Sequence, residues 1–341
     1  MRSSSKIFAI ALATLGLCSC EEYFELKGAG GQPKMYVECY AGLSDTTFLT
    51  LYKAVHVNGK RSDAADFTIK SMSLTVDGVP VSFNADSAPL LFSTTTAIPA
   101  GSKLEFTLET GETAPVSAST VVPDKPVFTV EQKVINTPGN FIRFRQFIVK
   151  FPGGFKEGEH YGVSIGHHVI YERSDSAETW DTYYADPPIT LGKADDSEAG
   201  TTQSVSLVVM GYPEEIRMAT FSADDYPEGS IAASIIDDFF IPDFDPGAYE
   251  GIEIPEDEGG EGDEIPEESD ETVVTHQYRV LVYKLSTETF GYFGALYNQQ
   301  SNFLAMLGLS APNYAYTNIS GGYGILGALT VAESPWITPE I

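Results

Sequence analysis

Short runs of alternating apolar and polar residues recur along nearly the whole chain after position 35, and turn-forming residues separate them. The alternation is cleanest from Lys103 to Glu109. A period of two residues is typical of strands with one buried face, and glycine, proline, aspartate and asparagine mark the turns between such strands. Signals for helices are scarce by comparison. The sequence therefore predicts an all-β protein, which we divide into two β-sandwich domains.

The first predicted domain covers residues 35–123. One hairpin is expected around Asp77 and Gly78, because this pair supplies the positive φ angles that a two-residue turn needs. Pro80 cannot donate a hydrogen bond to a neighbouring strand, so its strand is expected at a sheet edge. Several short strands in so short a segment predict a sandwich of the immunoglobulin-like or transthyretin-like kind.

The second predicted domain is larger and covers residues 124–336, with Pro123 and Pro126 marking the boundary. Residues 141–151 and 161–165 are expected to pair across the Pro-Gly-Gly turn at 152–154. Long uninterrupted strands are predicted at 204–210 and 273–284, and both are expected to be central. One short helix is predicted after Ser286, which can cap it, with Glu288 where a carboxylate favours the helix dipole.

The charge balance excludes one large class of partners. The chain carries 48 acidic and 20 basic residues, a formal net charge of −28, and would repel a phosphate backbone, so no nucleic-acid partner is expected. Residues 237–271 hold 16 of the acidic residues and no lysine or arginine, and we interpret them as a solvated loop inserted in the second domain. Asp243 and Asp245 begin like a calcium-binding loop. They are weak calcium candidates, because the other ligands of such a loop are missing.

The first twenty residues predict where the protein resides. Arg2 and Lys6 precede an apolar run that is too short to span a membrane, so residues 1–19 are predicted to be a signal peptide. The run ends in Cys20 and resembles a bacterial lipobox, which implies that Cys20 is lipidated and that residues 20–34 are a tether. The acids that follow resemble the surface-export signal of Bacteroidota lipoproteins, namely Glu21, Glu22 and Glu25. We expect a lipid-anchored outer-membrane protein that is exposed on the cell surface.

Two aromatic clusters are candidate contacts for a ligand or a partner. One lies in an irregular segment, and the other begins the acidic loop; together they comprise Tyr171, Trp180, Tyr183, Tyr184, Phe239, Phe240 and Phe244. Exposed aromatic rings stack on sugars or anchor protein interfaces, so a glycan or a peptide is the expected ligand. The alternative is that these rings pack a long loop onto its own domain.

Residues with catalytic potential do not form a complete site in the sequence. Ser164 lies in a Gly-x-Ser-x-Gly pattern like the nucleophile elbow of hydrolases, but the residues after it favour a strand and not the helix that this turn requires. His160, His167 and His168 are close in sequence. On a strand, only His160 and His168 would share a face, which leaves two metal ligands without a third. We expect no enzymatic activity, no cofactor and no metal.

Several motifs follow one another in a distinctive order: the lipobox, the strand that opens at Met35, residues 118–123, residues 221–224, the helix at 286–297 and the glycine-rich segment at 318–328. This order resembles the Bacteroidota lipoprotein family called domain of unknown function 4249. The resemblance implies an accessory of a TonB-dependent nutrient uptake system, with that transporter as a partner. A fimbrial or adhesin-type structural lipoprotein is the alternative, and a hydrolase that uses Ser164 is the third hypothesis.

Overall fold

The computed structural model describes residues 33–54, 65–86, 90–136, 143–173, 179–184, 189–193, 204–207, 216–236, 272–301 and 316–339. Within these residues the chain forms three β-sheets, one α-helix, α2 (Thr287–Ser301), and the 3₁₀ turn η2 (Ala223–Asp225). The predicted all-β class with a single short helix is therefore confirmed.

The largest sheet has ten strands and runs through the whole described structure. Nine of them follow the order β14-β15-β11-β17-β18-β1-β2-β6-β5, and β12 pairs with β11 off this path. Their bounds are β1 (Met35–Ala41), β2 (Thr47–Lys53), β5 (Asn84–Ala85), β6 (Leu91–Thr94), β11 (His160–Arg173), β12 (Thr179–Tyr184), β14 (Ser204–Leu207), β15 (Ile216–Ser222), β17 (Thr272–Leu285) and β18 (Tyr323–Glu333).

A four-stranded sheet packs on the N-terminal end of the large sheet. It has the order β4-β3-β7-β8, with β3 (Ile69–Val76), β4 (Val79–Val81), β7 (Lys103–Thr110) and β8 (Val116–Val121). Val37 and Leu51 of the large sheet share one hydrophobic core with Leu74 and Phe106 of the small one. Burial alternates strictly along β7, as its sequence predicts. This pair of sheets is the sandwich expected in the N-terminal part of the chain.

The predicted hairpin and its edge strand are both confirmed. Asp77 and Gly78 have φ angles of 51° and 81° and connect β3 to β4. Within the described part of the chain, the strand that contains Pro80 pairs with β3 alone and ends the order of its sheet.

A second four-stranded sheet packs on the other end of the large sheet. Its order is β13-β16-β10-β9, with β9 (Thr129–Asn136), β10 (Arg143–Lys150), β13 (Thr190–Gly192) and β16 (Ser230–Ile236). The predicted pairing of residues 141–151 with 161–165 is wrong, because β10 pairs with β9 and β16 while β11 pairs with β17. The intervening segment carries the chain from one sheet to the other. Phe147 of β10 and Val163 of β11 then meet face to face in one core.

The two strands predicted to be central differ in their outcome. β17 lies inside the large sheet, between β11 and β18, as its uninterrupted apolar sequence predicts. The strand in segment 204–210 is β14, which within the described residues ends the strand order and pairs with β15 alone. The prediction of a central position is therefore not met in the described part of the chain, although Val205 is buried.

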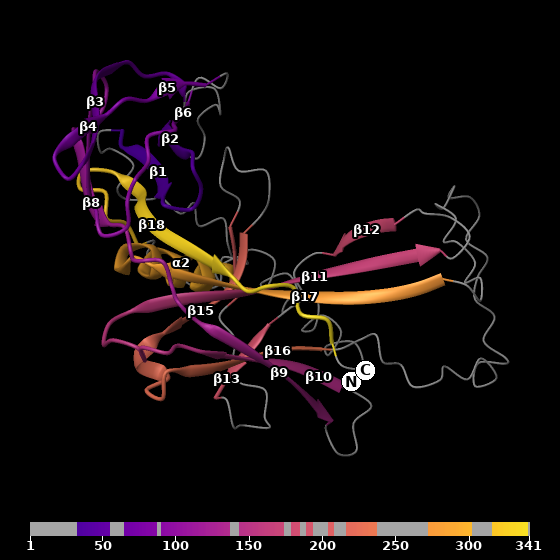
Figure 1. Ribbon diagram of the computed structural model, residues 1–341. Coiled ribbons are helices and arrows are strands. Elements are labelled where there is room, and N and C mark those ends of the chain that lie inside the picture. The colour runs from indigo at the N-terminus through magenta and orange to yellow at the C-terminus, as the bar shows by residue number, and fades with distance from the viewer. Residues whose placement is uncertain are drawn as a thin grey trace, which may run out of the picture.

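Strand β18 connects the two ends of the molecule (Figure 1). Its first half, from Tyr323 to Ala328, pairs in parallel with β1, and its second half, from Leu329 to Glu333, pairs antiparallel with β17. Ile319, Leu326 and Ala328 join the N-terminal core, so this C-terminal segment completes a sandwich that begins near residue 35. The predicted boundary at residues 123–124 stays a prediction.

The N-terminus of helix α2 contacts β18 at Ala328, where β18 changes from pairing with β1 to pairing with β17. Ser286 caps the helix as predicted, because its Oγ accepts a hydrogen bond from the Thr289 amide at 3.2 Å. The fully buried Thr289 hydroxyl accepts from the Ala328 amide at 2.9 Å and donates to the Ala328 carbonyl at 3.1 Å. One side chain thus satisfies two backbone groups at the change of partner.

We expect Thr289→Val to lower the free energy of unfolding by about 1–3 kcal/mol, because it leaves the buried Ala328 amide without an acceptor. Urea unfolding followed by circular dichroism measures this loss. Thr289→Ser keeps the hydroxyl and is the matched control. Equal stability of the Val and Ser variants would show that these two hydrogen bonds contribute nothing.

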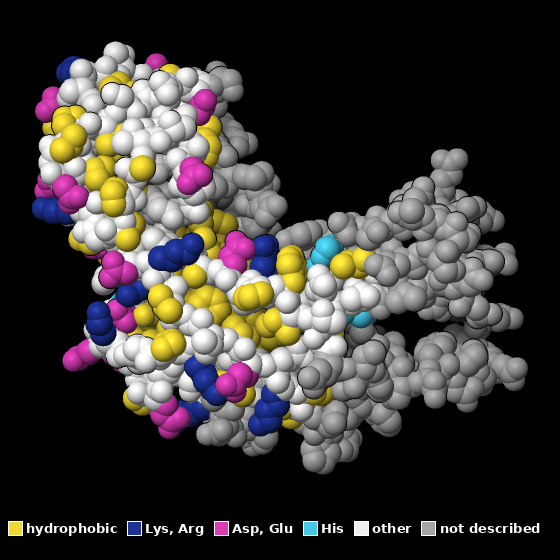
Figure 2. Space-filling model, viewed as in Figure 1, with side chains coloured by type: hydrophobic (Ala, Val, Ile, Leu, Met, Phe, Trp, Pro, Cys, Tyr) yellow, Lys and Arg dark blue, Asp and Glu magenta, His cyan; other side chains and the backbone are white. Residues whose placement is uncertain are grey.

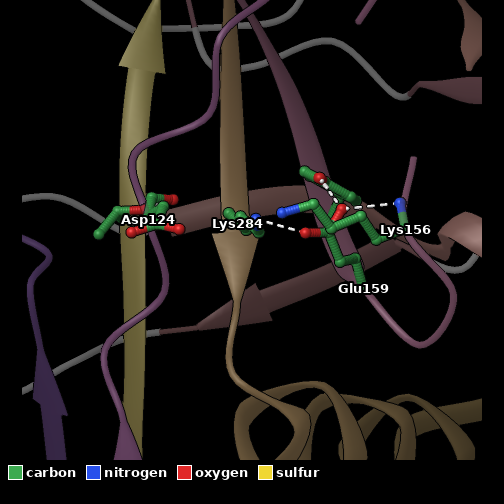
Figure 3. A network of polar contacts seen from close by, with 6 residues as sticks. Asp124, Lys156, Glu159 and Lys284 are labelled. Carbon is green, nitrogen blue, oxygen red and sulfur yellow. Dashed lines mark hydrogen bonds and ion pairs between the residues drawn. The ribbon is translucent and has the colours of Figure 1, made fainter. Parts of the chain in front are cut away.

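A partly buried ion pair ties β17 to the segment that leads into β11 (Figure 3). Lys284 Nζ donates to Glu159 Oε1 at 2.7 Å, and the two side chains are 15% and 17% exposed. Glu159 Oε2 accepts from the Tyr161 hydroxyl at 2.8 Å and from the Lys156 amide at 3.1 Å. Burial acts to raise the pKa of Glu159, but these hydrogen bonds and the Lys284 charge outweigh it and hold the pKa below its usual value.

We expect Glu159→Gln to lower the free energy of unfolding at neutral pH by about 1–3 kcal/mol. Because the pKa is lower in the folded state, the stabilisation is present above the ordinary pKa of 4.5 and is lost as the pH falls through the folded-state value. The gap between the wild type and the variant should therefore shrink in acid. Glu131→Gln is the control, since Glu131 pairs with Lys150 at an exposed position. An equal gap at all pH values would contradict the interpretation.

Candidate functional site

The distal halves of β11 and β17 extend beyond the strands that flank their other ends. The two strands pair along their full length, from His160 opposite Leu285 to Arg173 opposite Thr272. Among the described residues, β15 pairs with His160–Val163 of β11, β18 pairs with Leu281–Leu285 of β17, and β12 pairs with His167–Glu172 of β11. Figure 1 shows these three strands projecting from the rest of the protein. We call β12 and residues 164–173 and 272–281 the arm.

The structure places one of the two predicted aromatic clusters on the arm. Tyr171 pairs in register with Trp180, Tyr183 with His168, and Tyr184 with His167. Because positions alternate between the faces of a strand, Tyr171, Trp180 and Tyr184 occupy positions on one face of the ladder and Tyr183 on the other. Within the segment expected to be irregular, residues 179–184 therefore form a paired strand. The other predicted residues lie outside the described residues: Cys20, Glu21, Glu22, Glu25, Phe239, Phe240, Phe244, Asp243 and Asp245.

One face of the arm continues the hydrophobic core as a layer of stacked polar rings. His167 lies flat on Tyr278, with ring centroids 4.5 Å apart and planes 6° from parallel. His167 Nε2 and His276 Nδ1 are 3.1 Å apart, a hydrogen bond between two imidazoles. The buried guanidinium of Arg145 lies 5.2 Å from the centre of the same Tyr278 ring. Sequence reasoning missed this pair of histidines, because they come from strands about a hundred residues apart.

The opposite face carries a partly exposed aromatic and charged group that we call the outer patch, formed by His168, Arg279, Glu333 and Trp336. Trp336 is 36% exposed, and the Arg279 guanidinium lies 4.8 Å from its ring centroid. Arg279 also pairs with Glu333 at 2.6 Å, and the His168 ring lies 5.3 Å from Trp336. Next to Glu333 is a cleft of about 350 Å³ lined by Phe128, Thr129, Val130, Glu333, Ser334, Pro335 and Ile337.

Charged side chains are mixed in sign on the visible face of the described residues (Figure 2). Basic and acidic groups alternate there, with hydrophobic side chains between them. An anionic partner would therefore meet no continuous positive patch on this face.

The geometry at Ser164 lacks the features of a nucleophile elbow. Ser164 lies inside β11, opposite Leu281, and not at a turn from strand to helix. The residue is 2% exposed, and its hydroxyl donates to the Arg217 carbonyl. His276 is opposite Val169, five positions further along β11, and hydrogen-bonds to His167 instead. This arrangement gives the hydrolase hypothesis no support.

The histidines considered as metal ligands are separated by the fold. His160 stacks on Phe290 of α2 at 4.1 Å, whereas His168 belongs to the outer patch, eight residues further along β11. Burial lowers the pKa of His160, an effect that Asp224 partly offsets. Among the residues with a described position, no group of three metal-ligating side chains occurs.

A second polar cluster, which sequence reasoning did not identify, lies on β1 and α2. The Tyr36 hydroxyl hydrogen-bonds to Glu38 Oε2 at 3.2 Å and to the Tyr292 hydroxyl at 3.0 Å. Burial raises the pKa of Glu38, and hydrogen bonds from tyrosine partly offset the rise. The pKa of Tyr36 is also raised, first by burial and then by the neighbouring Glu38 charge. The alternation of Tyr36, Glu38 and Tyr40 along one strand was the available signal.

A sequence model of the family described as Domain of unknown function (DUF4249) matches residues 21–334. The chain belongs to this family. The match covers nearly all of the chain after Cys20, including both sandwiches, the arm and the polar cluster on β1, so these features belong to the family region. No curated protein and no solved structure matches this member of DUF4249. None of its described helices has the length and hydropathy needed to cross a membrane.

Proposed function

We propose that this DUF4249 protein is a surface-exposed lipoprotein of the outer membrane, without enzymatic activity, that binds a ligand for a TonB-dependent uptake system. The lipobox-like sequence ending in Cys20 and the acids Glu21, Glu22 and Glu25 support this location. The arm extends beyond the strands that flank the proximal ends of β11 and β17, and its outer face carries side chains available for contact.

The outer patch is the observation that carries the binding role. The exposed indole of Trp336 contacts the Arg279 guanidinium, and the Glu333 carboxylate and the His168 imidazole lie beside them. The patch therefore combines an apolar face with polar groups at its rim. Carbohydrates and peptides present the same combination of apolar and hydrogen-bonding surface. We therefore assign a glycan or peptide ligand to this patch, with Tyr183 in register beside His168.

Intrinsic fluorescence tests the assignment directly, because the chain contains only two tryptophans and both lie on or beside the arm, Trp180 in β12 and Trp336 in the outer patch. Purified protein is titrated with surface glycans and peptides, and a ligand of the patch should shift the emission. Trp336→Ala should weaken binding about tenfold or more, as expected for an aromatic anchor. Glu131→Gln, at an exposed pair on another sheet, is the control.

Cell-level experiments test the location and the partner. Protease treatment of intact cells should release the protein, and affinity capture followed by mass spectrometry should recover a TonB-dependent transporter. Resistance to protease together with capture of no transporter would refute the proposal.

A further inference from the structure

Three tyrosines form a row across adjacent strands, on the opposite face of β1 from the N-terminal core. Tyr36 lies between Tyr323 of β18 and Tyr52 of β2 in the register. The rings of Tyr36 and Tyr52 are 6.3 Å apart and tilted by 44°. Glu38 occupies the next row, between Ile325 and Thr50. We call Tyr36, Glu38, Tyr40 and Tyr292 the tyrosine nest.

Helix α2 covers one side of the tyrosine nest. Tyr292 is 8% exposed and its hydroxyl contacts that of Tyr36, while Phe293 packs against Tyr40 with ring centroids 6.0 Å apart. Tyr36 and Glu38 keep intermediate exposure. A small group can therefore reach Glu38 from the side that the helix leaves open.

Glu38 has no cationic partner among the residues that the structure describes. The ion pairs found there involve other acids, and the pKa of Glu38 responds to burial and to tyrosines alone. The ammonium of Lys34 lies instead over the Tyr323 ring, 4.7 Å from its centroid. A carboxylate that is partly removed from water without an opposite charge is costly, and such positions commonly serve binding.

The Tyr40 hydroxyl is a second polar group beside the Glu38 carboxylate. Tyr40 is fully buried, and its hydroxyl has no partner of regular hydrogen-bonding geometry in the described structure. It nevertheless lies near enough to Glu38 to lower the pKa of that carboxyl as a hydrogen-bond donor. Glu38 Oε1 can still accept a hydrogen bond, because each carboxylate oxygen has two acceptor positions.

We propose that the tyrosine nest binds the primary ammonium group of a small ligand. An ammonium has three donors and suits Glu38 Oε1 together with the hydroxyl oxygens of Tyr36 and Tyr292. The tyrosine rings stabilise the positive charge and pack against the attached methylenes. This site is separate from the arm, so it neither requires nor replaces the ligand proposed there.

Other cations fit the nest less well. A guanidinium prefers two free carboxylate oxygens, and Oε2 of Glu38 already accepts from Tyr36. A calcium or magnesium ion needs several oxygen ligands, usually with more than one carboxylate, whereas Glu38 is the single carboxylate of the nest. An ordered water is the remaining occupant and is an outcome of the test.

Calorimetric titration of the purified full-length protein tests the site. The probes are n-butylamine as a free amine, acetyl-lysine methylamide as a peptide side chain, and 1-butanol as an uncharged analogue. We expect saturable binding of both amines and none of 1-butanol. Binding of butylamine alone would identify free amines as the ligand source. Because burial raises the pKa of Glu38, binding near that pKa should also release protons, seen as a dependence of the heat on the buffer.

Glu38→Gln should weaken amine binding at least about tenfold and abolish the proton release. Tyr292→Phe removes only a hydroxyl from the helix surface and should weaken binding less while the protein stays folded. Trp336→Ala, in the outer patch, should bind amines like the wild type. No saturable binding of either amine, or equal binding by Glu38→Gln, would overturn the proposal and leave water as the occupant.

Discussion

Gly324→Ala should be among the most damaging single substitutions in the protein, lowering the free energy of unfolding by about 2–5 kcal/mol. Gly324 has a φ of +96°, which other residues rarely adopt. A Cβ atom at this position would lie 2.0 Å from the Val37 carbonyl oxygen, on the paired strand β1. Relief of that clash requires the two strands to separate, and this pairing joins the two ends of the chain.

Gly101→Ala is the matched control for this prediction. Gly101 has a φ of +81°, but a Cβ atom there would meet nothing within 4 Å. Its substitution should lower the free energy of unfolding by about 1–2 kcal/mol, which is the cost of the unfavourable φ angle without a steric clash. Chemical unfolding of both variants separates conformational strain from steric clash. Equal losses would contradict the view that close packing of β1 on β18 is needed for stability.

Phe293→Ala should have a comparable effect, with a loss of about 3–5 kcal/mol. Phe293 is fully buried between α2 and the sheet, and its ring packs on that of Tyr40. Its removal leaves a cavity under the helix, because the backbone on both sides is held by regular hydrogen bonds. We expect a lower midpoint in guanidinium unfolding, and weaker amine binding because the tyrosine nest depends on the position of α2.

Phe290→Ala is the comparison for Phe293. Phe290 is only partly buried and stacks on His160, so its loss should cost less and leave the tyrosine nest intact. If both substitutions reduced stability equally, the helix would not be anchored chiefly through Phe293.

The features that the sequence predicts correctly are those set by neighbouring residues. The alternation from Lys103 to Glu109, the Asp77-Gly78 turn and the Ser286 cap each depend on a few consecutive side chains and the local backbone. Such signals identify strands, turns and helix ends. They do not identify which strands become neighbours.

The incorrect predictions concern the choice of neighbouring strands. A strand with one buried face has the same alternation whether it pairs with the next strand in the sequence or packs against it from the opposing sheet. β10 and β11 lie in opposing sheets and pack face to face. The parallel pairing of β1 with β18 joins residues nearly three hundred positions apart. No local pattern predicts it.

The same distinction between local sequence signals and long-range strand pairing applies to the candidate sites. The alternating positions of Tyr36, Glu38 and Tyr40 were visible in the sequence, but Tyr292 and Tyr323 reach them only through the pairing of β18 and the packing of α2. Likewise, Trp336 joins Arg279 and His168 because the chain after β18 continues alongside β17. Sequence analysis therefore located aromatic residues without grouping them into sites.

Intact-mass analysis of the mature protein from its native membrane tests the central proposal most directly. We predict a chain that begins at Cys20 and carries acyl groups on its N-terminal cysteine, since several attached acyl chains hold a protein stably on a membrane. A mature species that retains residues 1–19, or that begins at Cys20 without lipid, would contradict the proposal.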